Sequence, residues 1–217
     1  MLKIMADNRN PHSLSARLRR DRFTFFLSLI SRLNQSITIL DVGGAEQFWK
    51  PLLSEFKMDI QITLLDLREQ TVSSQNIYSI TGDARNLHFP DASFDVVFSN
   101  SVIEHVGSYE SQRKMAEEVK RVAKRYFIQT PNKYFIIEPH FLFPFFQFLP
   151  MAIKVWLVRH FALGWFDKQS KPEYAREIIN SIHLLSKKDL LALFPGCKLY
   201  EEKVLGMTKS FIAYSGW

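Results

Sequence analysis

The chain has 217 residues, of which 47% are hydrophobic and 14% aromatic, enough for one substantial core and a single domain over residues 1–217. Its only cysteine, Cys197, excludes an internal disulfide framework and a multi-cysteine metal site, and it suits a reducing cytoplasm. The formal net charge of +6 is compatible with an anionic partner or a membrane surface, but proteins that bind neither often have such a charge.

Targeting and membrane-spanning signals are missing from the pattern of the sequence. The first residues lack the cleavage site and continuous apolar core of a signal peptide, and nowhere do about 18 apolar residues run without a charge. We therefore expect a cytoplasmic protein without a spanning helix, and peripheral contact with a membrane stays open.

Apolar residues at helical spacing predict an N-terminal helix over residues 13–33. Four arginines gather in its first half, at Arg17, Arg19, Arg20 and Arg22. We interpret them as the solvated end of a helix that covers one edge of a sheet. A basic lip over an active site, or a helix on a membrane surface, is the alternative interpretation.

Strand and helix signals alternate through residues 37–132. The alternation indicates βαβ units, so we predict an α/β fold with a Rossmann-like, doubly wound sheet that is mostly parallel. The predicted strands are Thr38–Val42, Gln61–Leu65, Ile77–Ile80, Phe94–Ser99 and Tyr126–Gln129, and the predicted helices are Phe48–Phe56 and Glu110–Lys124.

Polar residues stand where four of these strands end, at the edge where such sheets bind ligands. A glycine turn after Asp41 allows close approach of a nucleoside-containing cofactor. Asp66 suits two ribose hydroxyls, and Asp83 suits an exocyclic amine, with the Ala84 amide reaching a ring nitrogen. Either carboxylate could instead cap a local turn. Asn100 completes the set.

These segments resemble the successive motifs of class I S-adenosylmethionine-dependent methyltransferases, in particular the broad bacterial small-molecule group of the type 11 kind. The resemblance covers residues 37–132, the predicted cofactor-binding core. The matching segments are Val42-Gly43-Gly44 after Asp41, Leu64-Leu65-Asp66, Thr81-Gly82-Asp83-Ala84, the "FP-x-x-SFD" phrase at Phe89–Asp95, and Phe94–Val106.

The resemblance implies a role for each matching position toward S-adenosylmethionine, with S-adenosylhomocysteine as the product. Ala45 and Gln47 stand where the family's first motif usually has further glycines, which suggests different contacts in this loop. Asp41, Gly43 and Gly44 would line the methionine and ribose portion of the cofactor, and Asp66 would hold the ribose hydroxyls. The adenine would lie against Leu67, Asp83 and Ala84. Asn100 and Ser101 would lie near the methionine end and the transferred methyl group.

Two histidines are candidate catalytic residues, and we predict no metal site. His105 follows Glu104 after the fourth strand, where it could act as a general base or orient the start of the next helix. Glu138 and His140 lie in an apolar run after the fifth strand. There they could orient substrate and remove a proton, or form a hydrogen-bonded turn around Pro139.

Residues 133–185 form an insertion rich in phenylalanine and tryptophan and interrupted by prolines. We interpret it as a helical lid over the active site, which favours a hydrophobic or aromatic acceptor, or a lipid-like one taken from a membrane surface. Ordinary core or a dimer face is the alternative. Residues 186–217 close the fold with a capped helix at Ser186–Phe194 and two strands, the last antiparallel.

The sequence thus predicts a methyltransferase that acts on a small molecule, with O-methylation favoured. A nucleic-acid methyltransferase is an alternative, although Asn100-Ser101-Val102-Ile103 lacks the Asn/Asp-Pro-Pro-aromatic run of enzymes that clamp a flipped base. We therefore expect no nucleic-acid partner. A non-catalytic binding module with the same fold is the second alternative, and the oligomeric state stays open.

Overall fold

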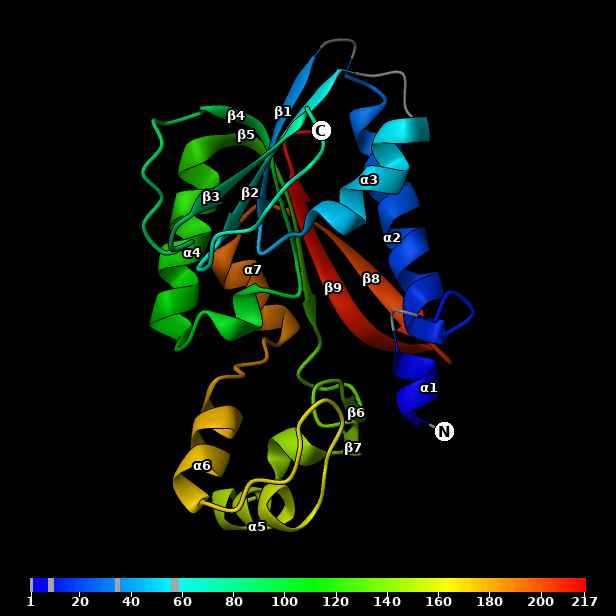
Figure 1. The fold of residues 1–217 in the computed structure, drawn as a ribbon, viewed down its shortest axis with the longest axis vertical. Coiled ribbons are helices and arrows are strands. Elements are labelled where there is room, and N and C mark those ends of the chain that lie inside the picture. Colours follow the sequence, from blue (N-terminus) through cyan, green and yellow to red (C-terminus); the bar gives the residue numbers. More distant parts are fainter. Residues whose placement is uncertain (1, 8–9, 34–35, 56–58) are drawn as a thin grey trace.

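The fold is that of a computed structural model, which describes residues 2–7, 10–33, 36–55 and 59–217 (Figure 1). Seven strands form one sheet in the order β3-β2-β1-β4-β5-β9-β8. β9 is antiparallel to β5 and β8 is antiparallel to β9, while the other pairs are parallel. The strands are β1 (Ile37–Val42), β2 (Ile60–Asp66), β3 (Ile77–Thr81), β4 (Phe94–Asn100), β5 (Ala123–Pro131), β8 (Lys198–Val204) and β9 (Met207–Ser215). The predicted Rossmann-like sheet is confirmed.

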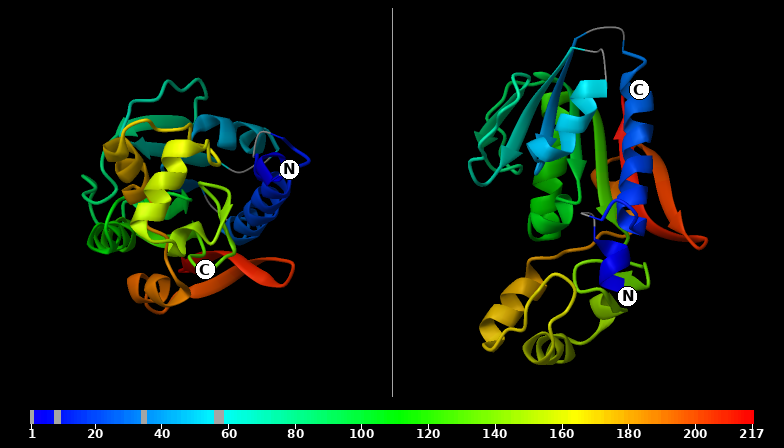
Figure 2. Two further views of the ribbon diagram at one scale, coloured as in Figure 1. Left: turned by 90° about the horizontal axis from the view of Figure 1, so that it is seen from below. Right: turned by 45° about the vertical axis from the view of Figure 1, so that its right-hand side comes forward.

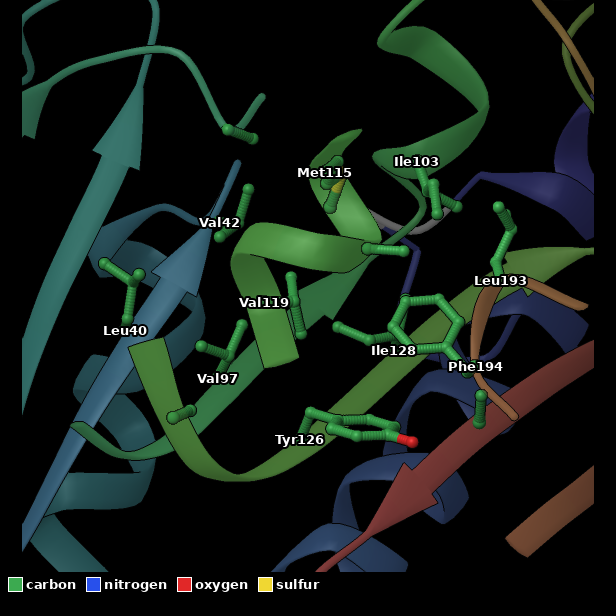
Figure 3. Packing of buried hydrophobic residues seen from close by; sticks show 14 of the residues in the cluster. Leu40, Val42, Val97, Ile103, Met115, Val119, Tyr126, Ile128, Leu193 and Phe194 are labelled. Atoms are coloured by element: carbon green, nitrogen blue, oxygen red, sulfur yellow. The ribbon is translucent and has the colours of Figure 1, made fainter. Parts of the chain in front are cut away.

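Helices cover both faces of this sheet, with α2 (Leu14–Ile30) and α3 (Glu46–Glu55) on one and α4 (Tyr109–Val122) and α7 (Lys187–Leu193) on the other (Figure 1). Alternate residues of the strands face the two layers. Ile39 packs with Phe26 of α2, whereas Leu40 packs in the cluster that contains Met115 of α4 (Figure 3). Burial of both faces explains why the central strands are almost continuously apolar.

The predicted alternation of strands and helices does not hold throughout. Residues 67–76 and 82–93, all of which the structure describes, connect β2 to β3 and β3 to β4 without a helix. β3 is the edge strand, and Tyr78 is 53% exposed there. The edge strand therefore lacks the helical cover that buries the central strands.

The N-terminal helix α2 differs from the predicted helix in its bounds, in where it packs on the sheet and in the burial of one arginine side chain. It begins after Ser13, whose side chain caps it, and ends at Ile30 rather than residue 33. It packs on a face of the sheet through Phe23 and Phe26 instead of covering an edge. Arg22 is buried, so the prediction of a wholly solvated basic end is wrong: the helix turns this side chain inward to a buried acid.

The insertion after β5 forms a separate apolar cluster beyond the carboxyl end of the sheet (Figures 1 and 2). Phe141 and Phe146 stack in it with their centroids 4.0 Å apart. A short helix, α1 (Leu2–Ala6), lies against this part of the chain through Lys3 over the ring of Trp165. The insertion contains β6 (Ile137–Glu138), β7 (Phe143–Pro144), a 3-10 turn at Phe146–Phe148, α5 (Met151–His160) and α6 (Pro172–Asn180).

The predicted capped helix is present as α7, with Ser186 as its N-cap. The side chain of Ser186 accepts from the backbone N–H of Asp189, and the Asp189 carboxylate accepts from the backbone N–H of Ser186, which completes a capping box. Among the described residues, we find no helix with the length and apolar character needed to cross a membrane.

Candidate active site

The strand register brings the predicted cofactor residues to one edge of the sheet. Asp41 pairs in register with Leu64 on one side and Phe98 on the other, and Asp66 pairs with Thr81. Because β1 to β4 are parallel, their carboxyl ends lie together where the strand order reverses. Asn100 is the last residue of β4 at this same edge.

The two glycines after β1 are required by the tight packing of the turn. Gly43 has φ +72°, and a Cβ there would lie 2.5 Å from Cγ2 of Val102. A Cβ on Gly44 would lie 1.7 Å from Oδ2 of Asp41. The turn then enters α3 at Glu46.

Asp41 is buried and holds this turn from behind. Its Oδ2 accepts a hydrogen bond from the indole Nε1 of Trp49 at 2.6 Å and packs against Gly44. Burial raises the pKa of Asp41 to about 7, although the hydrogen bond from Trp49 opposes the shift. The side chain thus connects β1, the glycine turn and α3.

The next two carboxylates differ in how available they are to a ligand. Asp66 accepts from the backbone N–H of Arg68 through Oδ1, and its Oδ2 has no hydrogen-bond donor among the residues that the structure describes. Asp83 is held by Arg85, whose Nη2 lies 2.6 Å from Oδ2, and this hydrogen bond lowers the pKa of Asp83. A ligand amine must therefore compete with Arg85 at Asp83. Leu67, 72% exposed, follows Asp66.

A buried polar network lies behind the end of β4. Arg22 donates to Oδ1 of Asn100 and to Oε1 of Gln129, and it forms a two-point ion pair with Glu202. Ser101, at φ +58°, donates to the same Gln129 oxygen at 2.8 Å. Residue spacing does not predict these roles of Gln129 and Glu202, because they are separated from Arg22 by 107 and 180 residues.

A cavity of about 500 Å³ opens beside this network. Asn100, Ser101 and His140 contribute to its wall, together with the basic side chains of Arg19 and Lys209. Most of its other lining residues are apolar, and they come from α2, the insertion and the β8–β9 hairpin: Leu14, Phe135, Ile136, Ile137, Leu142, Trp165, Val204, Leu205 and Met207.

The structure joins the two candidate catalytic pairs into one chain of contacts. Glu138 is 2% exposed and accepts from the backbone N–H groups of His140 and Phe141. Its Oε1 lies 2.7 Å from Nδ1 of His140, and Nε2 of His140 lies 3.1 Å from Nε2 of His105. The two imidazole rings meet edge to face at 90°.

The surroundings of the two histidines shift their pKa values in opposite directions. Burial would lower the pKa of His140, but the hydrogen bond and charge of Glu138 outweigh burial and raise it. Desolvation, with the neighbouring His140 as a second cause, lowers the pKa of His105 to about 4. Of the two rings, His140 is therefore the more basic.

Glu104 lies directly beside this pair and is fully buried. Its Oε2 accepts from the hydroxyl of Thr130 at 3.0 Å, while Oε1 has no hydrogen-bond partner among the described residues. Burial raises the pKa of Glu104 to about 7. The sequence pattern marks Glu104 only as the neighbour of His105, because residue spacing does not show that its side chain is buried.

The comparisons with known proteins agree with the fold. Residues 40–126, from β1 into β5, match the model of a family described as a methyltransferase domain. A SAM-dependent methyltransferase from Methanosarcina mazei is 15% identical, with 86% of this chain and 94% of that chain covered and a TM-score of 0.54. The PH0226 protein from Pyrococcus horikoshii OT3 is 16% identical, with 94% and 92% covered and a TM-score of 0.53.

Three further solved structures match this chain over only part of their length. The chain spans about half the length, 46% to 58%, of three further solved structures, among them the [4+2]-cyclase SpnF, at TM-scores of 0.41 to 0.46. No curated protein matches the chain. The chain thus shares the fold of a SAM-dependent methyltransferase of known structure, and its residues 40–126 match a methyltransferase domain.

Proposed function

We propose that this protein is an S-adenosylmethionine-dependent methyltransferase, which moves the methyl group to a hydroxyl oxygen of a small acceptor with a hydrophobic or aromatic body. The observation that carries the proposal is the cavity of about 500 Å³, which has mostly apolar walls and ends at Asn100, Ser101 and His140. Its volume and lining are typical of small-molecule sites.

The residues at the edge of the sheet fit the cofactor. The free Oδ2 of Asp66 can accept a hydrogen bond from a ribose hydroxyl, and the glycine turn allows close approach of the backbone. We assign the methionine end to Asn100 and Ser101, and the adenine to Leu67, Asp83 and Ala84, with Asp41 and the two glycines holding the loop. Bound S-adenosylmethionine supplies a methyl carbon that reacts readily with an oxygen placed in line.

The protein's task is then to position the acceptor oxygen, exclude water and handle one proton. The oxygen–methyl bond forms as the sulfur–methyl bond breaks, and the hydroxyl proton must leave the acceptor. His140 lies at the cavity wall, and we assign the activation of the hydroxyl to it, with Glu138 and His105 in contact with its ring. Arg19 and Lys209 favour acceptors that also carry an anionic group.

A matched acceptor screen tests this function. Release of S-adenosylhomocysteine is measured with phenols and hydroxylated lipids, and with the same molecules lacking the hydroxyl. We expect turnover only with the hydroxyl compounds, and His140→Ala should lower kcat by about 10²- to 10⁴-fold, the range for a lost general base. His160→Ala, in an exposed part of α5, is the control. Methylated nitrogen in the product, or methylation of RNA or DNA with a steep salt dependence, would contradict the proposal.

A further inference from the structure

Three side chains with metal-ligating atoms meet between the sheet and the insertion. A carboxylate oxygen of Glu104 and one ring nitrogen from each of His105 and His140 all lie within 4.8 Å of one another. Glu104 and His105 come from the 3-10 turn at Ile103–His105 after β4, whereas His140 follows β6 in the insertion. We name these three residues the Glu-His-His cluster.

The two imidazoles face each other through their Nε2 atoms, which lie 3.1 Å apart. A carboxylate only accepts, so the 2.7 Å contact with Glu138 places a proton on Nδ1 of His140. In the neutral ring of His140, Nε2 then carries a lone pair that points at His105. When the proton of His105 is on its Nδ1 as well, two lone pairs point at one another, which requires a cation or a shared proton between them.

The carboxylate of Glu104 also needs a cation or a proton beside it, for a separate reason. It is fully buried, Oε2 is satisfied by Thr130, and Oε1 has no partner in the described part of the chain. A buried carboxylate with an unsatisfied oxygen is costly unless a cation or a proton lies beside it. This carboxylate has an oxygen within 4.8 Å of a ring nitrogen of each histidine.

We infer that Glu104, His105 and His140 bind one divalent transition-metal ion, with Zn²⁺ as the representative case. Two nitrogens about 2.1 Å from one ion at a tetrahedral angle are about 3.4 Å apart, close to the separation of the two Nε2 atoms. Glu138 and Thr130 supply the outer hydrogen bonds that orient ligating imidazole and carboxylate groups in known sites.

Three protein ligands leave a coordination position open, as in catalytic rather than structural zinc sites. His140 lines the acceptor cavity and His105 is exposed, so an ion there is within reach of both solvent and acceptor. On the basis of the proposed function, a hydroxyl bound at this position becomes more acidic and loses its proton to water before methyl transfer. This inference departs from our sequence-based expectation of no metal site.

The test is calorimetric titration of the full-length, chelator-treated protein with Zn²⁺ alone, repeated with Co²⁺ while the visible absorption is recorded. We expect one ion per chain and a Co²⁺ spectrum typical of nitrogen and oxygen ligands. His105→Ala should weaken binding by more than about 100-fold, because outer hydrogen bonds alone account for about 10- to 100-fold. Glu138→Gln, which keeps the size of the side chain, should fall in that smaller range.

His88→Ala is the matched control, because His88 is an exposed histidine that contacts Asn86 outside the cluster. The inference would be overturned if His88→Ala weakened metal binding as much as His105→Ala, or if His105→Ala left the affinity unchanged. It would also be overturned if the wild type bound no metal ion, and a proton shared between the two rings would then be the explanation. S-adenosylmethionine binding is measured separately, so loss of the cofactor site and loss of the metal site are distinguishable. Thermal unfolding of each variant checks that it folds.

Discussion

At the scale of single residues, the site depends on acids that are buried for different reasons. Asp41 is enclosed by the turn and by Trp49, and Glu202 is neutralised by Arg22. Glu104 is enclosed with an open oxygen beside two imidazoles. An ion pair, a hydrogen bond and a bound cation are three ways to lower the cost of a buried carboxylate. The hydrogen bond from Trp49 serves Asp41 and the ion pair with Arg22 serves Glu202, and our metal proposal assigns the bound cation to Glu104.

The raised pKa of Asp41 predicts a pH-dependent stability. The folded chain holds the proton of Asp41 up to about pH 7, whereas an unfolded chain releases it near pH 4. Between these values the folded state binds more protons, so the free energy of unfolding contributed by this group falls as pH rises through the window. Asp41→Asn, which cannot ionise and still offers Trp49 an oxygen, removes this fall.

Urea unfolding between about pH 4 and pH 8 measures the effect. From about pH 4 to pH 8, the free energy of unfolding of the wild type should fall by a few kcal/mol more than that of Asp41→Asn, an order-of-magnitude value for a buried acid. Asp59→Asn, at an exposed position, should follow the wild type. Identical pH profiles for the wild type and Asp41→Asn would refute the assignment.

At the scale of elements, the closing helix α7 is short and depends on its cap. Ser186 is buried, accepts from the backbone of Asp189 and donates its hydroxyl proton to the Asp189 carboxylate. Ser186→Ala should lower the free energy of unfolding by about 1 kcal/mol. Ser181→Ala, where the hydroxyl bonds to the Ile178 carbonyl at an exposed helix end, is the control. Denaturant unfolding that shows no difference between the two variants would count against a stabilising cap.

The insertion exposes large apolar side chains that its own core does not use. Phe145, Phe148, Trp156 and Phe161 are 48% to 53% exposed, with Lys154 and the other basic residues of α5 nearby. Such a surface favours peripheral contact with anionic lipid and delivery of a lipid-like acceptor. Sedimentation with phosphatidylglycerol vesicles should therefore be weakened by Trp156→Ser but not by Tyr78→Ser on edge strand β3. Equal binding by both variants would place the contact elsewhere.

The fold and the site differ in how far the sequence predicts them. Strand positions and the ends at Asp66 and Asn100 follow from continuous apolar runs, because the central strands are buried on both faces. The Arg85 partner of Asp83 and the meeting of His105 with His140 depend on side-chain geometry, which residue spacing does not encode. The burial of Arg22 depends on its ion pair with Glu202, which lies near the other end of the chain, so the local sequence does not predict it.

At the scale of the whole molecule, the sheet holds one set of binding groups and the insertion completes another. The carboxyl edge of β1, β2 and β4 presents Asp66 and the glycine turn, and the insertion adds His140 and aromatic walls to the cavity beside Asn100. The closing hairpin contributes to the same cavity through Lys209. We therefore assign cofactor binding to the sheet and acceptor recognition to the insertion, α2 and the hairpin.

Calorimetric titration with S-adenosylmethionine and S-adenosylhomocysteine tests this central assignment most directly. We expect the wild type to bind both ligands, and Asp66→Ala to lose at least about tenfold in affinity, since a charge-assisted hydrogen bond contributes about 1.5–3 kcal/mol. Glu173→Ala, on the exposed face of α6, should bind as the wild type does. Undiminished binding by Asp66→Ala, or no binding by the wild type, would contradict the account and favour a binding module that only shares the fold.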